Sequence, residues 1–198
     1  MKQFFVGLIA LFASSVLSSP SAMAQQPLVV KMLAEKKVME LPVGPLFWRL
    51  ENFPTIAQAQ AAASPTGLAA ESAGKAWLFT LGPAGGSSVG GIKVAEVGPL
   101  PHLMATQYLL RINEASGPPG STTAVHKHPG SEAFYVLAGE QSIRSPQGLI
   151  HVKVGQPNTG PGGDTPLQVS SSGSTDLHAL VMFMVDATKP FSSPAELP

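Results

Sequence analysis

The chain has 198 residues, and only 12% of them are charged, whereas soluble globular domains carry about 25%. Twelve basic and twelve acidic side chains cancel, which argues against nucleic acid or an anionic membrane surface as a partner. Leu, Ile, Val and Phe make up about a quarter of the residues, above the roughly 20% below which chains stay disordered. We therefore expect a folded domain whose partner is a small-molecule ligand or substrate.

Residues 1–24 have the three parts of a secretory signal peptide. Lys2 precedes an apolar run from residue 4 to residue 17, and Ala22-Met23-Ala24 provides a small-residue cleavage site. A membrane-spanning helix needs about 20 apolar residues, and this run is shorter. We predict cleavage near Ala24 and a mature protein that is periplasmic or secreted, without a membrane anchor.

Residues 25–74 are predicted to form an N-terminal extension that contains extra strands and one short helix. Alternating apolar and polar side chains indicate a strand, and a Thr before an Ala-rich stretch indicates a capped helix. The expected elements are an extended segment at 27–41, a strand at 47–53, a helix at 56–63 after the N-cap Thr55, and a second helical turn at 68–73.

Residues 75–190 read as short strands between Gly- and Pro-rich turns. This spacing favours an all-β fold, either an antiparallel sandwich or a barrel, and disfavours helical and doubly wound folds. Residues 191–198 are predicted to be a loose C-terminal tail. The expected strands are 76–81, 91–97, 106–112, 122–128, 133–138, 149–154, 165–169 and 177–185.

One cluster of ionisable residues indicates chemistry. His126 and His128 are two apart, so both rings face the same way on a strand, and a turn at Pro129-Gly130 brings Glu132 back toward them. Two His and one carboxylate form the facial ligand set of non-haem iron sites, which also suits Mn, Ni or Zn. Since the chain has no cysteine, thiolate ligands and thiol nucleophiles are excluded. The alternative is a surface hairpin in which these side chains only form hydrogen bonds.

The spacing around this cluster resembles the first conserved motif of the cupin superfamily, G-x5-H-x-H-x3-E-x6-G. Gly120, His126, His128, Glu132 and Gly139 occupy its fixed positions. The resemblance implies a small single-domain antiparallel jelly-roll barrel, in agreement with the strand pattern. It also implies that the two His and the Glu are metal ligands and that the two glycines lie at turns.

The second cupin motif, usually G-x5-P-x-G-x2-H-x3-N, is degenerate here. Gly155, Pro161 and Gly163 match its start, but Pro166 stands where the motif has a third histidine and Ser170 where it has Asn. Proline has no side-chain donor, so the ligand set that the resemblance implies is one histidine short.

Two residues are candidate substitutes for the missing ligand or candidate pocket residues. Gln168 lies two positions beyond Pro166 and would face the same way on a strand, as an amide ligand or as a plain polar lining residue. His178 alternates with Leu180 and would contact metal or ligand if that face lines the barrel, or would be a hydrogen-bonded core histidine. His151 is expected to face solvent.

Two functions follow from these residues and stay open. The first is a metal-dependent enzyme that acts on a small organic molecule; the cupin resemblance leaves the reaction open, and two His with one Glu favour dioxygenase-like chemistry. The alternative is a non-catalytic periplasmic protein that binds a metal or a small ligand, which the missing histidine favours. No catalytic residue beyond the metal ligands is identified. The resemblance also implies a homodimer through edge-strand pairing as one arrangement.

Overall fold

The computed structural model describes residues 26–198, and the predicted signal peptide lies outside these residues. The described chain is built from antiparallel strands and one short helix, which confirms the all-β fold class. Within residues 26–198, no helix has the length and apolarity of a membrane span. The elements are β1 (Val29–Val38), β2 (Phe47–Phe53), α1 (Ile56–Ala61), β3 (Gly67–Ser72), β4 (Lys75–Gly82), β5 (Ile92–Val97), β6 (Tyr108–Gly117), β7 (His126–Lys127), β8 (Gly130–Ala138), β9 (Glu140–Ser145), β10 (Gly148–Lys153), β11 (Pro157–Thr159), β12 (Gln168–Ser171), β13 (Leu177–Asp186) and β14 (Ser193–Pro194).

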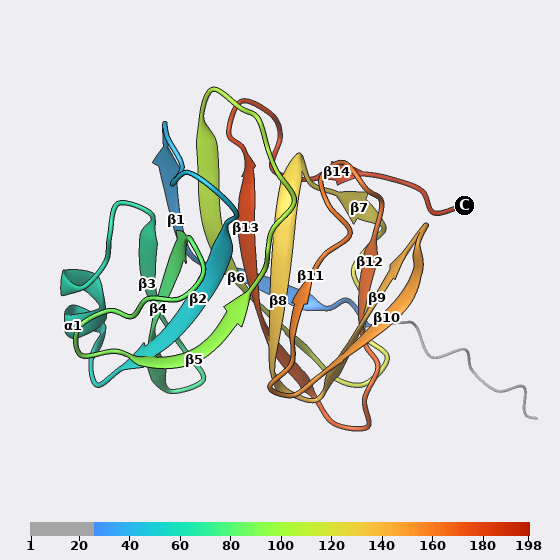
Figure 1. Ribbon diagram of the computed structural model, residues 1–198. Helices are drawn as coiled ribbons and strands as arrows, with labels where there is room; N and C mark the ends of the chain where they lie inside the picture. The colour runs from blue at the N-terminus through green and yellow to red at the C-terminus, as the bar shows by residue number, and fades with distance from the viewer. Residues whose placement is uncertain (1–25) are drawn as a thin grey trace, which may run out of the picture.

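The strands are arranged in three layers (Figure 1). The central layer is a five-stranded sheet with the order β1-β6-β13-β8-β11. A four-stranded sheet, β3-β4-β2-β5, lies on one side of it, and the three-stranded sheet β10-β9-β12 lies on the other, beside the short pair β14-β7. The central sheet is therefore covered on both faces, which explains why β13 is almost entirely buried.

Each interface between layers has its own hydrophobic core. Alternate residues of the central strands point to opposite faces, so the strands supply both cores. The core between the central and four-stranded sheets includes Trp48, Leu50, Trp77, Phe79, Leu110, Ile112, Leu180 and Met182. The core on the other face includes Leu109, Phe134, Val136, Ile143, Val152, Val169, Val181 and Phe183.

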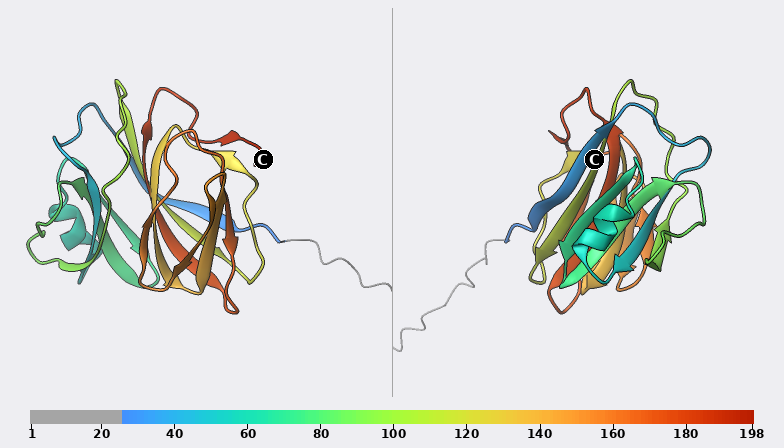
Figure 2. Two further views of the ribbon diagram at one scale, coloured as in Figure 1. Left: turned by 45° about the vertical axis from the view of Figure 1, so that its right-hand side comes forward. Right: turned by 90° about the vertical axis from the view of Figure 1, so that its left-hand side faces the viewer.

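Helix α1 lies on the outer face of the four-stranded sheet (Figure 2). Thr55 caps it as predicted, because its hydroxyl oxygen accepts a hydrogen bond from the backbone N–H of Gln58 at 3.2 Å. Ala59 is fully buried and packs with Leu78 and Phe53 in a small third cluster. The predicted helix at 56–63 therefore forms, and it is two residues shorter than expected.

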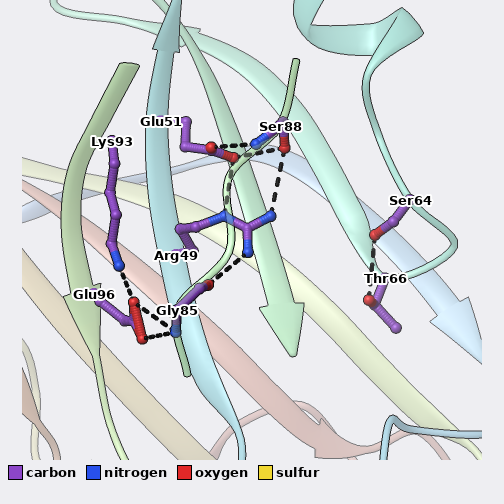
Figure 3. A network of polar contacts seen from close by, with 8 residues as sticks. All are labelled: Arg49, Glu51, Ser64, Thr66, Gly85, Ser88, Lys93 and Glu96. Carbon is purple, nitrogen blue, oxygen red and sulfur yellow. Dashed lines mark hydrogen bonds and ion pairs between the residues drawn. The ribbon is translucent and has the colours of Figure 1, made fainter. Parts of the chain in front are cut away.

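The outer face of β2 also carries a polar network that holds the Gly-rich loop after β4 (Figure 3). The Glu51 carboxylate is fully buried, pairs with Arg49 at 3.1 Å, and accepts hydrogen bonds from the Ser88 backbone N–H and hydroxyl, both at 2.7 Å. Arg49 in turn donates to the Gly85 carbonyl at 3.0 Å. Burial alone would raise the pKa of Glu51, but the Ser88 hydrogen bonds and Arg49 outweigh it and hold that pKa below its usual value.

Several predicted elements differ from the structure. Residues 68–73 are not a helical turn; they belong to β3, because pairing with β4 buries Leu68 and Ala70 in a core. The boundary predicted between residues 74 and 75 falls in the turn of the β3–β4 hairpin, so the expected extension and barrel share one sheet. The C-terminal residues are not a loose tail either, since Ser193 and Pro194 pair with β7.

Candidate metal centre

His126, His128 and Glu132 line one pocket, which lies on the face of the central sheet opposite the four-stranded sheet. Its volume is about 400 Å³, within the range of small-molecule sites. The two histidines come from β7 and the residue after it, and Glu132 lies inside β8 directly opposite Phe183 of β13. The three side chains therefore lie in one pocket, as the spacing of the motif predicts.

Both histidine rings have one nitrogen engaged by a backbone carbonyl. Nδ1 of His126 lies 2.8 Å from the Ala124 oxygen, and Nδ1 of His128 lies 2.6 Å from the Phe191 oxygen. A carbonyl oxygen only accepts, so each Nδ1 carries a proton, and the neutral form of each ring has its lone pair on Nε2. Metal-binding histidines are oriented in this way in proteins. The two rings lie edge to face, with centroids 5.0 Å apart.

Glu132 is a buried carboxyl group that has no ion-pair partner among residues 26–198. It is 4% exposed, and burial raises its pKa to about 8. The chain is closely packed beside it: the Gly160 N–H donates to the Glu132 carbonyl at 2.8 Å, and a Cβ at position 160 would lie 2.6 Å from Glu132 Cγ. Glycine at this position is therefore what allows the strand β8 and the loop after β11 to approach each other.

The C-terminal segment covers the pocket. The Phe191 ring packs against His128 with a centroid distance of 4.7 Å and against Phe183 at 5.0 Å, and the Arg111 guanidinium lies over its other side at 3.8 Å from the ring centroid. Burial lowers the pKa of His128 to about 4, with His126 and Arg111 acting in the same direction and the Phe191 carbonyl opposing them. His128 is therefore neutral at pH 7, as a metal ligand must be.

The donor chemistry of these residues fits a divalent metal ion. The Nε2 atoms of the two histidines and the buried carboxyl group face the same cavity. A cation bound there would provide the positive charge that pairs with an ionised Glu132. Within residues 26–198, however, no three His, Asp or Glu side chains lie close enough together to hold a metal ion. The Glu132 side chain or the rings would have to turn toward a common point.

The two candidate substitutes for the missing histidine do not line the pocket. On β12, the neighbouring Val169 points into the pocket, whereas Gln168 points away and donates to the Thr123 carbonyl at 3.0 Å. His178 faces the four-stranded sheet, where its Nε2 lies 3.2 Å from the Glu114 carboxylate and 3.3 Å from the Ser72 hydroxyl. The prediction that Gln168 or His178 is an additional ligand or pocket residue is therefore wrong, because strand alternation turns both side chains away from the pocket. His151 is exposed, as expected.

The motif glycines lie at turns, as the resemblance implies. Gly120 and Gly139 have φ values of +83° and +72°, a region that favours glycine. At Gly139 a Cβ would also lie 2.6 Å from the Asp176 carbonyl oxygen. Pro166 precedes Leu167, which pairs through its backbone with His126, so the position of the missing histidine is adjacent to the site.

Phe191 and Asn113 are among the pocket residues that sequence reasoning missed. Phe191 lies in a segment with no strand pattern, and its contact with His128 spans 63 residues of the chain. Asn113 directly follows the predicted strand 106–112, and in the structure β6 continues through it to Gly117.

Among known proteins, only solved structures are similar to this chain. No family model and no curated protein matches the chain. A DMSP lyase from Ruegeria pomeroyi aligns over 43% of this chain and 43% of its own, with 21% identity and a TM-score of 0.37. A cupin-like protein from Thermotoga maritima aligns over 44% of this chain and 65% of its own, with 15% identity and a TM-score of 0.39. A cupin domain from Bordetella pertussis aligns over 38% of this chain and 80% of its own, with 20% identity and a TM-score of 0.33.

The chain thus aligns with less than half the length of the lyase. Antiparallel sheets pack face to face around a pocket, and the first motif places its two His and its Glu in that pocket. Its two glycines occupy turns with positive φ. The chain therefore resembles the cupins in its all-β fold and in its complete first motif, whereas its second motif lacks the histidine.

Proposed function

We propose that this chain is a cupin that binds a divalent metal ion through His126, His128 and Glu132 and holds a small organic molecule in the same pocket. The observation that carries the proposal is the pair of Nδ1 atoms bonded to backbone carbonyls, since it leaves both Nε2 atoms as donors beside a buried carboxyl group. A bound ion would polarise an oxygen atom of the small molecule.

The residues of the site favour a protein that binds its ligand without catalysing a reaction. Pro166 replaces the third histidine, and the pocket walls are mostly apolar, with Leu28, Phe134, Val169, Val181 and Phe183 among them. Among the residues that line the pocket in the described chain, His126, His128 and Glu132 are the ionisable ones. They leave no separate acid or base for proton transfer once they bind metal.

A dioxygenase-like enzyme is the second candidate function. It is favoured by the ligand set itself, because two His and one carboxylate leave coordination positions open for a substrate and dioxygen. Oxygen consumption by the metal-loaded protein, measured with a panel of phenols and diketones, separates the two: turnover of any compound establishes the enzyme, and binding without turnover supports the binder.

Metal content tests the site. The full chain, purified without chelator and incubated with Fe(II), Mn(II), Ni(II) or Zn(II) before dialysis, is expected to retain about one ion per chain. His126→Ala and His128→Ala are expected to retain less than about a tenth of that. His151→Ala is the matched control, because His151 is an exposed histidine that pairs with Glu140 on the surface. A wild-type protein that retains no stoichiometric metal overturns the proposal.

The proposal also covers location and assembly. Export would follow from residues 1–24 and would place the protein in the periplasm or the medium, which fractionation of expressing cells tests.

Pairing of two copies along β10 would form a homodimer: this strand is the edge of its sheet and exposes Leu149 and Ile150. Light scattering coupled to size exclusion, with Ile150→Lys as the variant, tests the dimer.

A further inference from the structure

Asn113 lines the pocket, and the Oδ1 atom of its side-chain amide has no hydrogen-bond partner within the described chain. It lies in the middle of β6, between the paired residues Met32 on β1 and Val181 on β13. Alternation along β6 sends Ile112 into the other core and turns Asn113 to the pocket face. The side chain is 5% exposed, and its Oδ1 is buried without a hydrogen-bond partner among the described residues.

An unpaired amide at such a position is costly, because a buried polar group loses its hydrogen bonds to water. Val181, its direct neighbour on β13, is apolar, so an apolar residue at position 113 would suit this strand. The pocket is the part of its surroundings that is open to another molecule. The amide therefore points to a missing partner, which a ligand can supply.

The rest of the pocket defines the chemistry of that ligand. Its walls include the aromatic rings of Phe134, Phe183 and Phe191, which suit a flat apolar body. No Lys or Arg is among the lining residues of the described chain, so no positively charged side chain of the pocket wall pairs with an anionic ligand, and only a bound metal ion would do so. A carboxamide both donates and accepts, and a hydroxyl group does the same.

We propose that Asn113 determines ligand specificity by hydrogen-bonding to the hydroxyl group of a small, uncharged aromatic alcohol or phenol in this pocket. The inference rests on the proposed function in taking this pocket as the ligand site, and it adds the class of ligand and the residue that selects it. The proposed metal ligands lie on β7, directly after it and on β8, whereas Asn113 lies on β6, so the two sets of contacts can be tested separately.

The test compares phenol with toluene, which has a methyl group in place of the hydroxyl. Binding is measured by NMR titration of the full chain, once after treatment with EDTA and once loaded with Zn(II), and metal content is measured in the same samples. Wild type is expected to bind phenol about tenfold or more tightly than toluene. In Asn113→Leu this ratio is expected to fall to about one, because toluene binding persists and the hydrogen bond is lost.

Asn52→Leu is the matched control. Asn52 lies on β2 in the four-stranded sheet, and its buried Nδ2 also lacks a hydrogen-bond partner in the described chain. This variant is expected to keep the wild-type ratio. Asn113→Leu is expected to melt at or above the wild-type temperature, since an unpaired polar group is replaced by an apolar one. A structural role for Asn113 predicts the reverse.

If Asn113→Leu does not fold, wild type still decides. The side-chain NH₂ signals of Asn113 are expected to shift with phenol and to stay in place with toluene. An unchanged ratio in Asn113→Leu, equal binding of the two probes by wild type, or binding of neither overturns the inference, even where metal is bound. Asn113-dependent selectivity in a protein without metal supports the inference and overturns the metal proposal alone.

Discussion

The backbone carbonyl of Phe191 lies 2.6 Å from Nδ1 of His128, although the two residues are 63 positions apart. Through this contact, the C-terminal end of the chain determines which ring nitrogen of the pocket histidine carries the proton. The Phe191 ring covers the same histidine, and β14 pairs with β7 immediately after it. The C-terminal segment is therefore part of the candidate site.

Removing this segment is expected to weaken metal binding. A chain that ends at Pro190 loses the carbonyl acceptor of His128 and the ring that covers it, and loss of such a partner costs about 10- to 100-fold in metal affinity. A chain that ends at Pro194 keeps both and is expected to bind like wild type. Titration calorimetry with Zn(II) measures the affinities; equal affinity of the two shortened chains contradicts the prediction.

Substitution of Gly160 is expected to disturb Glu132. A Cβ at this position would lie 2.6 Å from Glu132 Cγ and 3.2 Å from the Phe134 ring, so Gly160→Ala should lower the free energy of unfolding by about 1–3 kcal/mol and weaken metal binding. Gly82→Ala is the control, because a Cβ there meets nothing within 4 Å. Urea denaturation measures both variants. A wild-type stability for Gly160→Ala would show that Glu132 moves freely.

The stability of the metal-free protein is expected to fall between pH 6.5 and 8. Because burial raises the pKa of Glu132 to about 8, the folded chain binds more protons than the unfolded chain from pH 4.5 to 8, and the stabilising contribution is lost as pH rises through 8. His128 acts in the opposite direction, since its pKa is lowered to about 4 and stability rises with pH between 4 and 6.5.

Above pH 6.5 the contribution of His128 levels off, so Glu132 dominates the pH dependence up to pH 8. The Glu132 contribution has a slope of at most about 1.4 kcal/mol per pH unit in the free energy of unfolding. Position 132 does not titrate in Glu132→Gln, so the fall in stability between pH 6.5 and 8 should be absent from this variant. Urea denaturation of the EDTA-treated proteins at pH 6.5, 7.2 and 8 provides the measurement, and parallel curves for wild type and Glu132→Gln contradict the prediction.

The Arg49–Glu51 pair is expected to stabilise the four-stranded sheet. Glu51→Ala leaves Arg49 and two Ser88 donors without their buried partner, which should cost about 3 kcal/mol. The double variant with Arg49→Ala should cost less than the sum of the single changes, by about 1–3 kcal/mol. Glu35→Ala, which removes a surface partner of Arg111, should cost under about 1 kcal/mol. Additive losses in the double-mutant cycle would contradict coupling.

Much of the fold follows from local patterns that are visible in the sequence. Period-2 alternation identifies β2, a nearly continuous apolar run identifies β13, and Thr55 before an Ala-rich stretch identifies α1, because these signals depend on neighbouring residues. The segment at 68–73 shows the limit: its Ala content favours a helix, but pairing with β4 buries one face and makes it a strand. Tertiary burial outweighs the small intrinsic preference.

The sequence by itself determined the spacing of His126, His128 and Glu132, and this spacing predicted that the three side chains come together, as they do in one pocket. The predicted hairpin does not form, because β7 pairs with β14 and β8 pairs with β13 and β11. Only the tertiary structure decided which other residues join them. Gln168 and His178 point away because strand register sets their faces, while Asn113 and Phe191 enter the pocket from distant strands. The physical reason is that a motif is read along the chain, whereas register and sheet packing depend on contacts between segments far apart in sequence.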